Sequence, residues 1–212
     1  MSIPVTVIDY GIGNLLNVVR AFEYCGGSVR VINRFSSGDL ESSRLVLPGV
    51  GAFGDGMREL RARGLDDLIL DFAATGRPFL GICAGLQMMF SVGEEMGKHQ
   101  GLGLLDGHVR PVPPTGVDGV FHRIPHIGWR ALAATTDWGS SILSDLQQGE
   151  RVYFVHSYAA EPVVHDIQLA TVSYGGHDIC AAVQYGNLHG CQFHPERSAL
   201  PGLSIIKRFL SL

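Results

Sequence analysis

The chain has 212 residues, 46% of them hydrophobic and 17% charged, which suits one globular domain with a large core and excludes an intrinsically disordered chain. The formal net charge of −4 and the lack of a basic run argue against nucleic-acid binding. No apolar run approaches the ~18 residues of a membrane span, and the first residues lack the pattern of a secretory signal, so we expect a cytoplasmic protein without a membrane partner.

Strands and helices alternate through the first half of the sequence. Short β-branched or apolar runs predict strands at 5–9, 29–32, 44–48 and 78–82. Apolar residues at helical spacing predict helices over 14–24 and near 55–62 and 65–75, and a further helix that begins over 85–90. This alternation is typical of a parallel sheet with helices on both faces, so we predict an α/β fold.

The second half has a different pattern. Strand-like segments lie close together at 107–112, 128–133, 152–158, 167–173, 179–185 and 188–193, with short turns at 175–176 and 186–187. This spacing predicts an antiparallel section added to the mostly parallel core. A closing helix is predicted at 203–210, and the polar Pro/Gly-rich stretch 111–126 is a candidate functional loop. No internal repeat or linker interrupts the sequence, so we expect a single domain over 1–212.

The strongest chemical motif is Gly81-Ile82-Cys83-Ala84-Gly85, between a predicted strand and a predicted helix. The pattern G-x-C-x-G is the cysteine form of a nucleophile elbow. Glycines two residues before and after the nucleophile relieve crowding at the strained turn. The chain has four cysteines without metal-site spacing, and Cys83 is the one with such neighbours. We therefore predict that Cys83 is a nucleophile on an elbow.

A base and a carboxylate occur together in Gln192-Phe193-His194-Pro195-Glu196. A nucleophilic cysteine needs a base, and the base needs a group that orients it. Pro195 disfavours the helical conformation at His194, so we expect extended backbone there. In extended chain, residues i and i+2 point the same way, so Glu196 is expected to hold the imidazole of His194.

Acyl transfer also needs hydrogen-bond donors for the developing oxyanion. The elbow supplies the backbone N–H of Ala84. The turn Pro48-Gly49-Val50-Gly51 follows another predicted strand and is the candidate source of a second donor.

Six segments carry a family resemblance. The segments 48–53, 81–87 and 192–196 resemble the class I (triad) glutamine amidotransferases. The segments 8–15, 125–129 and 153–158 resemble the branch that forms the glutaminase subunit of imidazole glycerol phosphate synthase, in histidine biosynthesis. The resemblance covers nearly the whole chain. It implies that the chain hydrolyses glutamine to glutamate and ammonia, and we expect neither a cofactor nor a metal.

The resemblance also implies roles for individual residues. Cys83 would form a γ-glutamyl thioester, His194 would transfer protons, and Glu196 would orient His194. The oxyanion hole would be formed by backbone N–H groups around Val50, Gly51 and Ala84. The residues assigned to glutamine binding are Gly49, Gln87, Glu95, Ser157 and Tyr158, although Glu95 also fits a solvated surface charge.

The partner implied by the resemblance is a (β/α)₈-barrel cyclase subunit that receives the ammonia in a heterodimer. The residues that match partner-facing positions are Asn14, His126, Trp129, Arg130 and Tyr153. Arg130 stands where the family usually has asparagine. It keeps open an alternative in which a paralogous pair supplies ammonia for an amidino sugar in surface-polysaccharide biosynthesis.

Three other functions fit parts of the sequence less well. An unrelated cysteine hydrolase, such as a peptidase or deglycase-like protein, also places cysteine on an elbow, but fits Gln87 and the His-Pro-Glu segment poorly. A catalytically silent binding subunit is disfavoured by the intact triad. A dinucleotide site at Gly11-x-Gly13 is rejected because the third glycine and the following acidic residue are missing.

Overall fold

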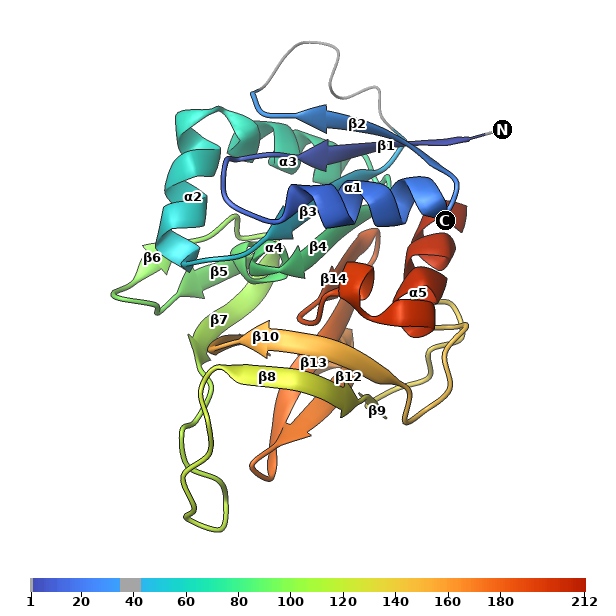
Figure 1. Cartoon of the computed structure of the whole chain (residues 1–212). Helices are drawn as coiled ribbons and strands as arrows, with labels where there is room; N and C mark the ends of the chain where they lie inside the picture. The colour runs from blue at the N-terminus through green and yellow to red at the C-terminus, as the bar shows by residue number, and fades with distance from the viewer. Residues whose placement is uncertain (1, 35–42) are drawn as a thin grey trace.

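The centre of the molecule is an eight-stranded sheet with the order β2-β1-β3-β4-β14-β13-β12-β9 (Figure 1). The computed structural model describes residues 2–34 and 43–212. Neighbouring strands are parallel from β2 to β14 and antiparallel from β14 to β9. The strands are β1 (Ile3–Ile8), β2 (Gly27–Ile32), β3 (Leu45–Gly49), β4 (Phe79–Cys83), β9 (Ala133–Ala134), β12 (Gln168–Tyr174), β13 (His177–Tyr185) and β14 (Leu188–Cys191).

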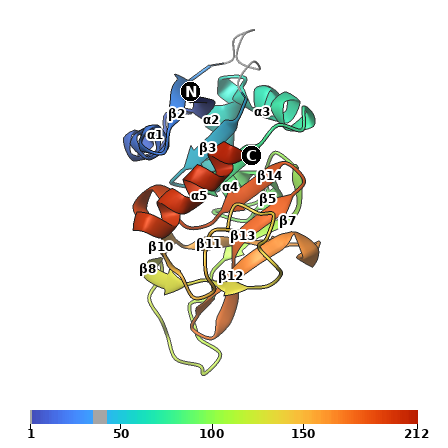
Figure 2. The ribbon, with the colours of Figure 1, turned by 90° about the vertical axis from the view of Figure 1, so that its right-hand side faces the viewer.

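Helices cover both faces of this sheet, as predicted. Helices α1 (Leu15–Tyr24) and α5 (Ala199–Ser211) lie on one face, and α2 (Phe53–Ala62) and α3 (Leu65–Ala74) lie on the other (Figure 2). Each face has its own hydrophobic cluster. On the first, the rings of Phe22 and Phe209 meet edge to face at 6.1 Å. The apolar spacing seen in the sequence therefore corresponds to the buried faces of these helices.

Two smaller sheets complete the fold. One pairs β8 (His126–Ala131) with β10 (Arg151–His156), and the other has the order β11 (Tyr158–Pro162), β7 (Leu105–Pro111), β5 (Phe90–Gly93) and β6 (His99–Gln100). Single 3₁₀ turns occur at His165–Ile167 and Pro195–Arg197. The predicted antiparallel section is thus confirmed, as an extension of the main sheet and as separate strands. Among the helices in the described part of the chain, none combines the length and the apolar composition of a membrane span.

The helix after the elbow is shorter than the sequence indicated. Helix α4 (Ala84–Met88) has five residues, and the chain enters β5 at Phe90. The carbonyls of Met88 and Met89 accept hydrogen bonds from the N–H groups of Leu102 and Leu104, at 2.8 and 2.9 Å. Distant backbone therefore takes the acceptors that a longer helix would use.

One predicted strand is in fact two. The segment 152–158 divides at Ser157 into β10, which pairs with β8, and β11, which pairs with β7. The alternating pattern continues through the break, so periodicity alone does not reveal that the chain changes sheets. Ser157 consequently lies at the junction of two sheets.

Candidate active site

Cys83 ends β4 in a strained conformation, with φ 52° and ψ −111°. Positive φ is uncommon for a residue with a side chain and costs about 1–3 kcal/mol. The neighbouring glycines explain why the turn is possible. A Cβ on Gly81 would lie 2.5 Å from the sulfur of Met89, and a Cβ on Gly85 would overlap the carbonyl oxygen of Leu47. The geometry is that of a nucleophile elbow, as the sequence predicted.

His194 and Glu196 form a buried pair. Their Nδ1 and Oε1 atoms are 2.8 Å apart, and the two side chains are 5% and 4% exposed. His194 is extended, as expected, but Pro195–Arg197 form a 3₁₀ turn, so the expectation of extended chain up to Glu196 was wrong. The turn itself brings the carboxylate to the ring. This pairing leaves Nε2 of His194, which is buried and has no hydrogen-bond partner among the described residues, for another group.

The electrostatics of His194 depend on its two neighbours. Burial alone would lower its pKa, but the Cys83 sulfur and the Glu196 carboxylate outweigh burial and raise the pKa above the ordinary value of 6.5. A raised pKa favours the imidazolium form beside a negative sulfur. The arrangement can therefore hold a thiolate–imidazolium pair, the reactive state of a cysteine nucleophile.

An open pocket of about 460 Å³ lies beside Cys83. That volume is within the ~300–1,000 Å³ range of small-molecule sites. The pocket brings together residues from distant parts of the sequence that were predicted to bind glutamine or its oxyanion: Val50, Gly51, Ala84, Gln87, Glu95, Ser157 and Tyr158.

Gln87 is held by two hydrogen bonds from its amide nitrogen. Nε2 donates to the carbonyl oxygen of Tyr158 at 2.8 Å and to Oε1 of Gln192 at 3.0 Å. A side-chain amide has two N–H groups, so both donors of Gln87 are used within the protein. Only its oxygen remains to receive a ligand.

Glu95 lies in the pocket but also has a structural contact. Its Oε2 accepts a hydrogen bond of 2.7 Å from the backbone N–H of Phe53, the first residue of α2. A carboxylate there is favoured by the unpaired N–H groups at a helix start. Glu95 therefore anchors the helix that directly follows the turn 48–51, and its second oxygen is the one left for a ligand.

Comparison with known proteins agrees with this geometry. The family model for glutamine amidotransferase class-I matches residues 6–211. The chain belongs to the class-I glutamine amidotransferases.

Curated relatives support the same family over the full length. A protein named imidazole glycerol phosphate synthase subunit HisH 1, from Legionella pneumophila (strain Lens), is 48% identical over 98% of this chain and 99% of its own. A subunit HisH from Rhodopirellula baltica is 44% identical over 97% and 96%. The structure of PurLQS from Thermotoga maritima matches the fold, with a TM-score of 0.74 at 21% identity over 100% of this chain and 99% of that chain. The chain is therefore a glutamine-hydrolysing enzyme, as its sequence predicted.

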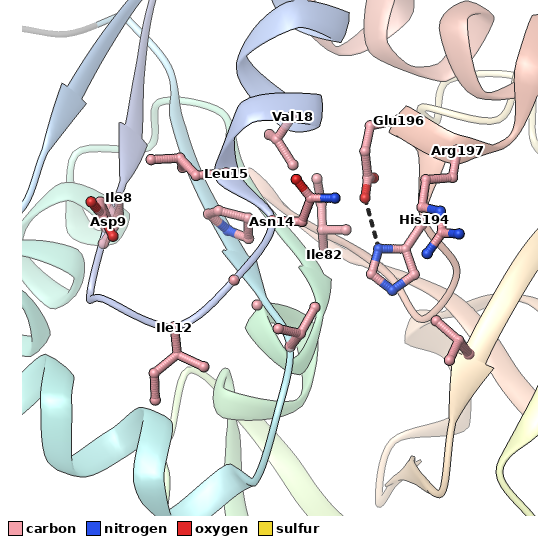
Figure 3. Close-up of a pocket in the computed structure, with 15 residues that line it drawn as sticks. Ile8, Asp9, Ile12, Asn14, Leu15, Val18, Ile82, His194, Glu196 and Arg197 are labelled. Carbon is pink, nitrogen blue, oxygen red and sulfur yellow. Dashed lines mark hydrogen bonds and ion pairs between the residues drawn. The ribbon is translucent and has the colours of Figure 1, made fainter.

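Gly49 lies outside the large pocket of this amidotransferase. It lines a smaller cavity of about 60 Å³ on the other side of the turn, together with Asn14, His194 and Glu196 (Figure 3). A Cβ at Gly49 would lie 2.5 Å from the hydroxyl of Tyr10, so glycine is required for packing there. Its predicted role in glutamine binding stays a prediction.

His126 does not fit the prediction that it faces a partner. Its ring is 0% exposed and stacks between Phe154 and Tyr174, with centroids 5.0 and 4.0 Å away. Its Nδ1 is 3.0 Å from Nε2 of His156. A ring that is completely buried cannot contact another chain, so the interface assignment of His126 is corrected to a core role. The alternation of β8 places it on the inner face.

The outer face of the β8–β10 sheet carries two of the other predicted interface residues, Trp129 and Tyr153, whereas Arg130 is on the same side of β8 as His126. Trp129 is 39% exposed and pairs edge to face with Tyr153 at 6.1 Å, directly across the two strands. Arg130 donates to the carbonyl of Trp129 at 3.2 Å, and its guanidinium lies 5.8 Å from the ring of Tyr174. These contacts within the chain give Arg130 a local packing role. Asn14 precedes α1 and lines the small cavity, which Val155 of β10 also lines.

Sequence reasoning missed three residues of the site. Arg197 lines both cavities and lies 4.4 Å above the ring of Tyr153. Tyr10 is buried beneath the turn 48–51, and burial together with the nearby Cys83 raises its pKa. Gln192 contacts the nucleophile itself, with its Nε2 3.7 Å from Sγ of Cys83. Tyr10 and Gln192 lie in the motif segments 8–15 and 192–196, and Arg197 directly follows the second. Their place in or beside these motifs is the only sign of a role that the sequence offers.

Proposed function

We propose that this chain is the glutaminase subunit of an imidazole glycerol phosphate synthase. The observation that carries the proposal is the Cys83 elbow beside the buried His194–Glu196 pair, in a chain 48% identical to a full-length subunit of that name. Cys83 attacks the side-chain amide carbon of glutamine, and His194 protonates the departing ammonia. Water then cleaves the γ-glutamyl thioester with His194 as base, releasing glutamate. Glu196 keeps the imidazole oriented and stabilises its charged form.

The pocket residues suggest how glutamine is oriented. Because both N–H groups of Gln87 are already used, its oxygen accepts from the α-ammonium group, as does the free oxygen of Glu95, which lines the same pocket. Two acceptors in the pocket select the positive group of the amino acid. The α-carboxylate then lies toward Ser157 and Tyr158. Backbone N–H groups around Val50, Gly51 and Ala84 stabilise the oxyanion.

The ammonia passes to a (β/α)₈-barrel cyclase subunit in this proposal. Free ammonia is protonated in bulk water and is then no nucleophile, so a closed route preserves it. The small cavity behind the turn 48–51 contacts His194 and Glu196 and is lined by Asn14, which supports an exit on that side. The exposed Trp129 and the half-buried Tyr153 provide an aromatic surface for docking, the type of residue enriched in interfaces.

A complementation assay tests both halves of the proposal. The barrel protein that co-purifies with this chain is mixed with wild type or Cys83→Ala, and imidazole glycerol phosphate is measured with glutamine or ammonium chloride as nitrogen source. We expect Cys83→Ala to abolish the glutamine-dependent reaction and to retain the ammonia-dependent one. Failure of both reactions in the variant would show that Cys83 does more than release ammonia. A wild-type complex that hydrolyses glutamine without forming this product would refute the assigned pathway alone.

A further inference from the structure

A second side-chain amide lies against the nucleophile. Gln192 is 0% exposed, and its Nε2 is 3.7 Å from Sγ of Cys83. The sulfur is also 3.9 Å from the carbonyl oxygen of Val155. The thiol thus has one neighbour that can only accept a hydrogen bond and one that can donate to it.

The orientation of the Gln192 amide is determined by its other contact. Gln87 donates from Nε2 to Oε1 of Gln192 at 3.0 Å. The same Nε2 of Gln87 also donates to Tyr158, whose carbonyl can only accept. Rotating the Gln192 amide would set two N–H donors against each other and place an oxygen against the sulfur. The amide N–H of Gln192 therefore points at Cys83.

The acceptor at the far end of this chain of hydrogen bonds is itself held in place. The carbonyl of Tyr158 is 2.9 Å from Nδ1 of His156, which donates to it. Nε2 of His156 then accepts from His126. Buried rings and backbone thus hold Gln87, and Gln87 holds Gln192.

We propose that Gln192 is a positioning residue that holds the Cys83 side chain and stabilises its thiolate by donating a hydrogen bond to the sulfur. The idea rests on the proposed function, because it concerns the same nucleophile. A hydrogen bond to an ionised group is stronger than one to a neutral group, so it favours the thiolate over the thiol. Gln192 lies two residues before His194, and its amide is a donor to the sulfur that is separate from the catalytic imidazole.

The test is alkylation of Cys83 by iodoacetamide as a function of pH, followed by mass spectrometry of the peptide that contains it. No glutamine and no partner are needed, so the result is independent of turnover. Gln192→Met removes the donor. Gln192→Glu keeps the shape and the acceptor for Gln87 but places a carboxylate beside the sulfur. Gln184→Met is the matched control, because Gln184 is a side-chain amide of β13 and the hydrogen bonds described for the Cys83 sulfur are with Val155 and Gln192.

We expect the midpoint of the alkylation profile to move up by about one pH unit in Gln192→Met. Gln192→Glu is expected to move it further, and Gln184→Met is expected to match wild type. Since Gln192→Glu preserves the contact with Gln87, a shift in that variant is not due to loss of Gln87. A wild-type midpoint in folded Gln192→Met overturns the proposal, because that variant removes the donor without adding a charge. If Gln192→Met shows the expected shift but the wild-type complex with the barrel partner fails to hydrolyse glutamine, the proposed function is refuted and this inference stands.

Discussion

Three buried histidines predict that acid destabilises the fold. Burial lowers the pKa of His126 to about 3 and of His156 and His189 to about 4, with the neighbouring His156 adding to the effect at His126. Each is lowered from an unfolded value of 6.5. The unfolded state therefore binds protons below pH 6.5 that the folded state does not, so stability falls as the pH falls.

The size of the effect follows from these values. Between pH 7.5 and 5.5, each histidine lowers the free energy of unfolding by about 1.4 kcal/mol, or about 4 kcal/mol for the three. His194 acts in the opposite direction. Its raised pKa contributes stability that is complete below pH 6.5 and is lost as the pH rises through about 10. Between pH 7.5 and 5.5 this contribution grows as the pH falls, so it offsets part of the destabilisation by the other three histidines. A net loss of a few kcal/mol is large beside the usual ~5–15 kcal/mol of total stability.

Urea unfolding followed by tryptophan fluorescence at pH 7.5 and 5.5 measures this difference. His189→Gln removes one of the three groups and should shrink the difference between the two pH values by about 1.4 kcal/mol. His165→Gln changes an exposed histidine and is the matched control. An unchanged pH difference in His189→Gln would show that buried histidines do not cause the acid sensitivity.

Three further substitutions test the site and the surface. Glu196→Gln loses one charge-assisted hydrogen bond, about 1.5–3 kcal/mol, so kcat for glutamine hydrolysis should fall roughly 10–100-fold, less than in His194→Ala; equal losses would contradict an orienting role. Gly85→Ala forces a methyl group into the backbone of β3 and should lower the free energy of unfolding by about 3 kcal/mol or more. Urea titration measures this loss, and near-wild-type stability would show that the elbow is not crowded. Tyr153→Ala should weaken the complex with the barrel partner about tenfold or more by calorimetry, whereas Tyr185→Ala, at an exposed tyrosine of β13, should not; equal affinities would place the interface elsewhere.

Local chemistry was readable from the sequence. The elbow depends on the absence of side chains at Gly81 and Gly85. The carboxylate–imidazole pair joins two residues that are two positions apart, and the buried face of each helix follows from apolar residues repeating every three or four positions. Each of these involves neighbours along the chain, so the predicted helices that became α1, α2, α3 and α5 and the Cys83 turn agree with the structure. Family membership over residues 6–211 agrees with them as well.

Contacts between distant segments had to come from the tertiary structure. The burial of His126, the break at Ser157 and the short helix α4 each depend on which strand lies opposite, and a repeating pattern of apolar residues does not specify that partner. The contact of Gln192 with Cys83 spans 109 positions in the sequence. The sequence by itself determined which residues carry the chemistry, because each motif, 81–85 and 192–196, is a short run of neighbouring residues. The fold decided which atoms meet, because burial and hydrogen bonding to remote backbone set the direction of every side chain around the sulfur.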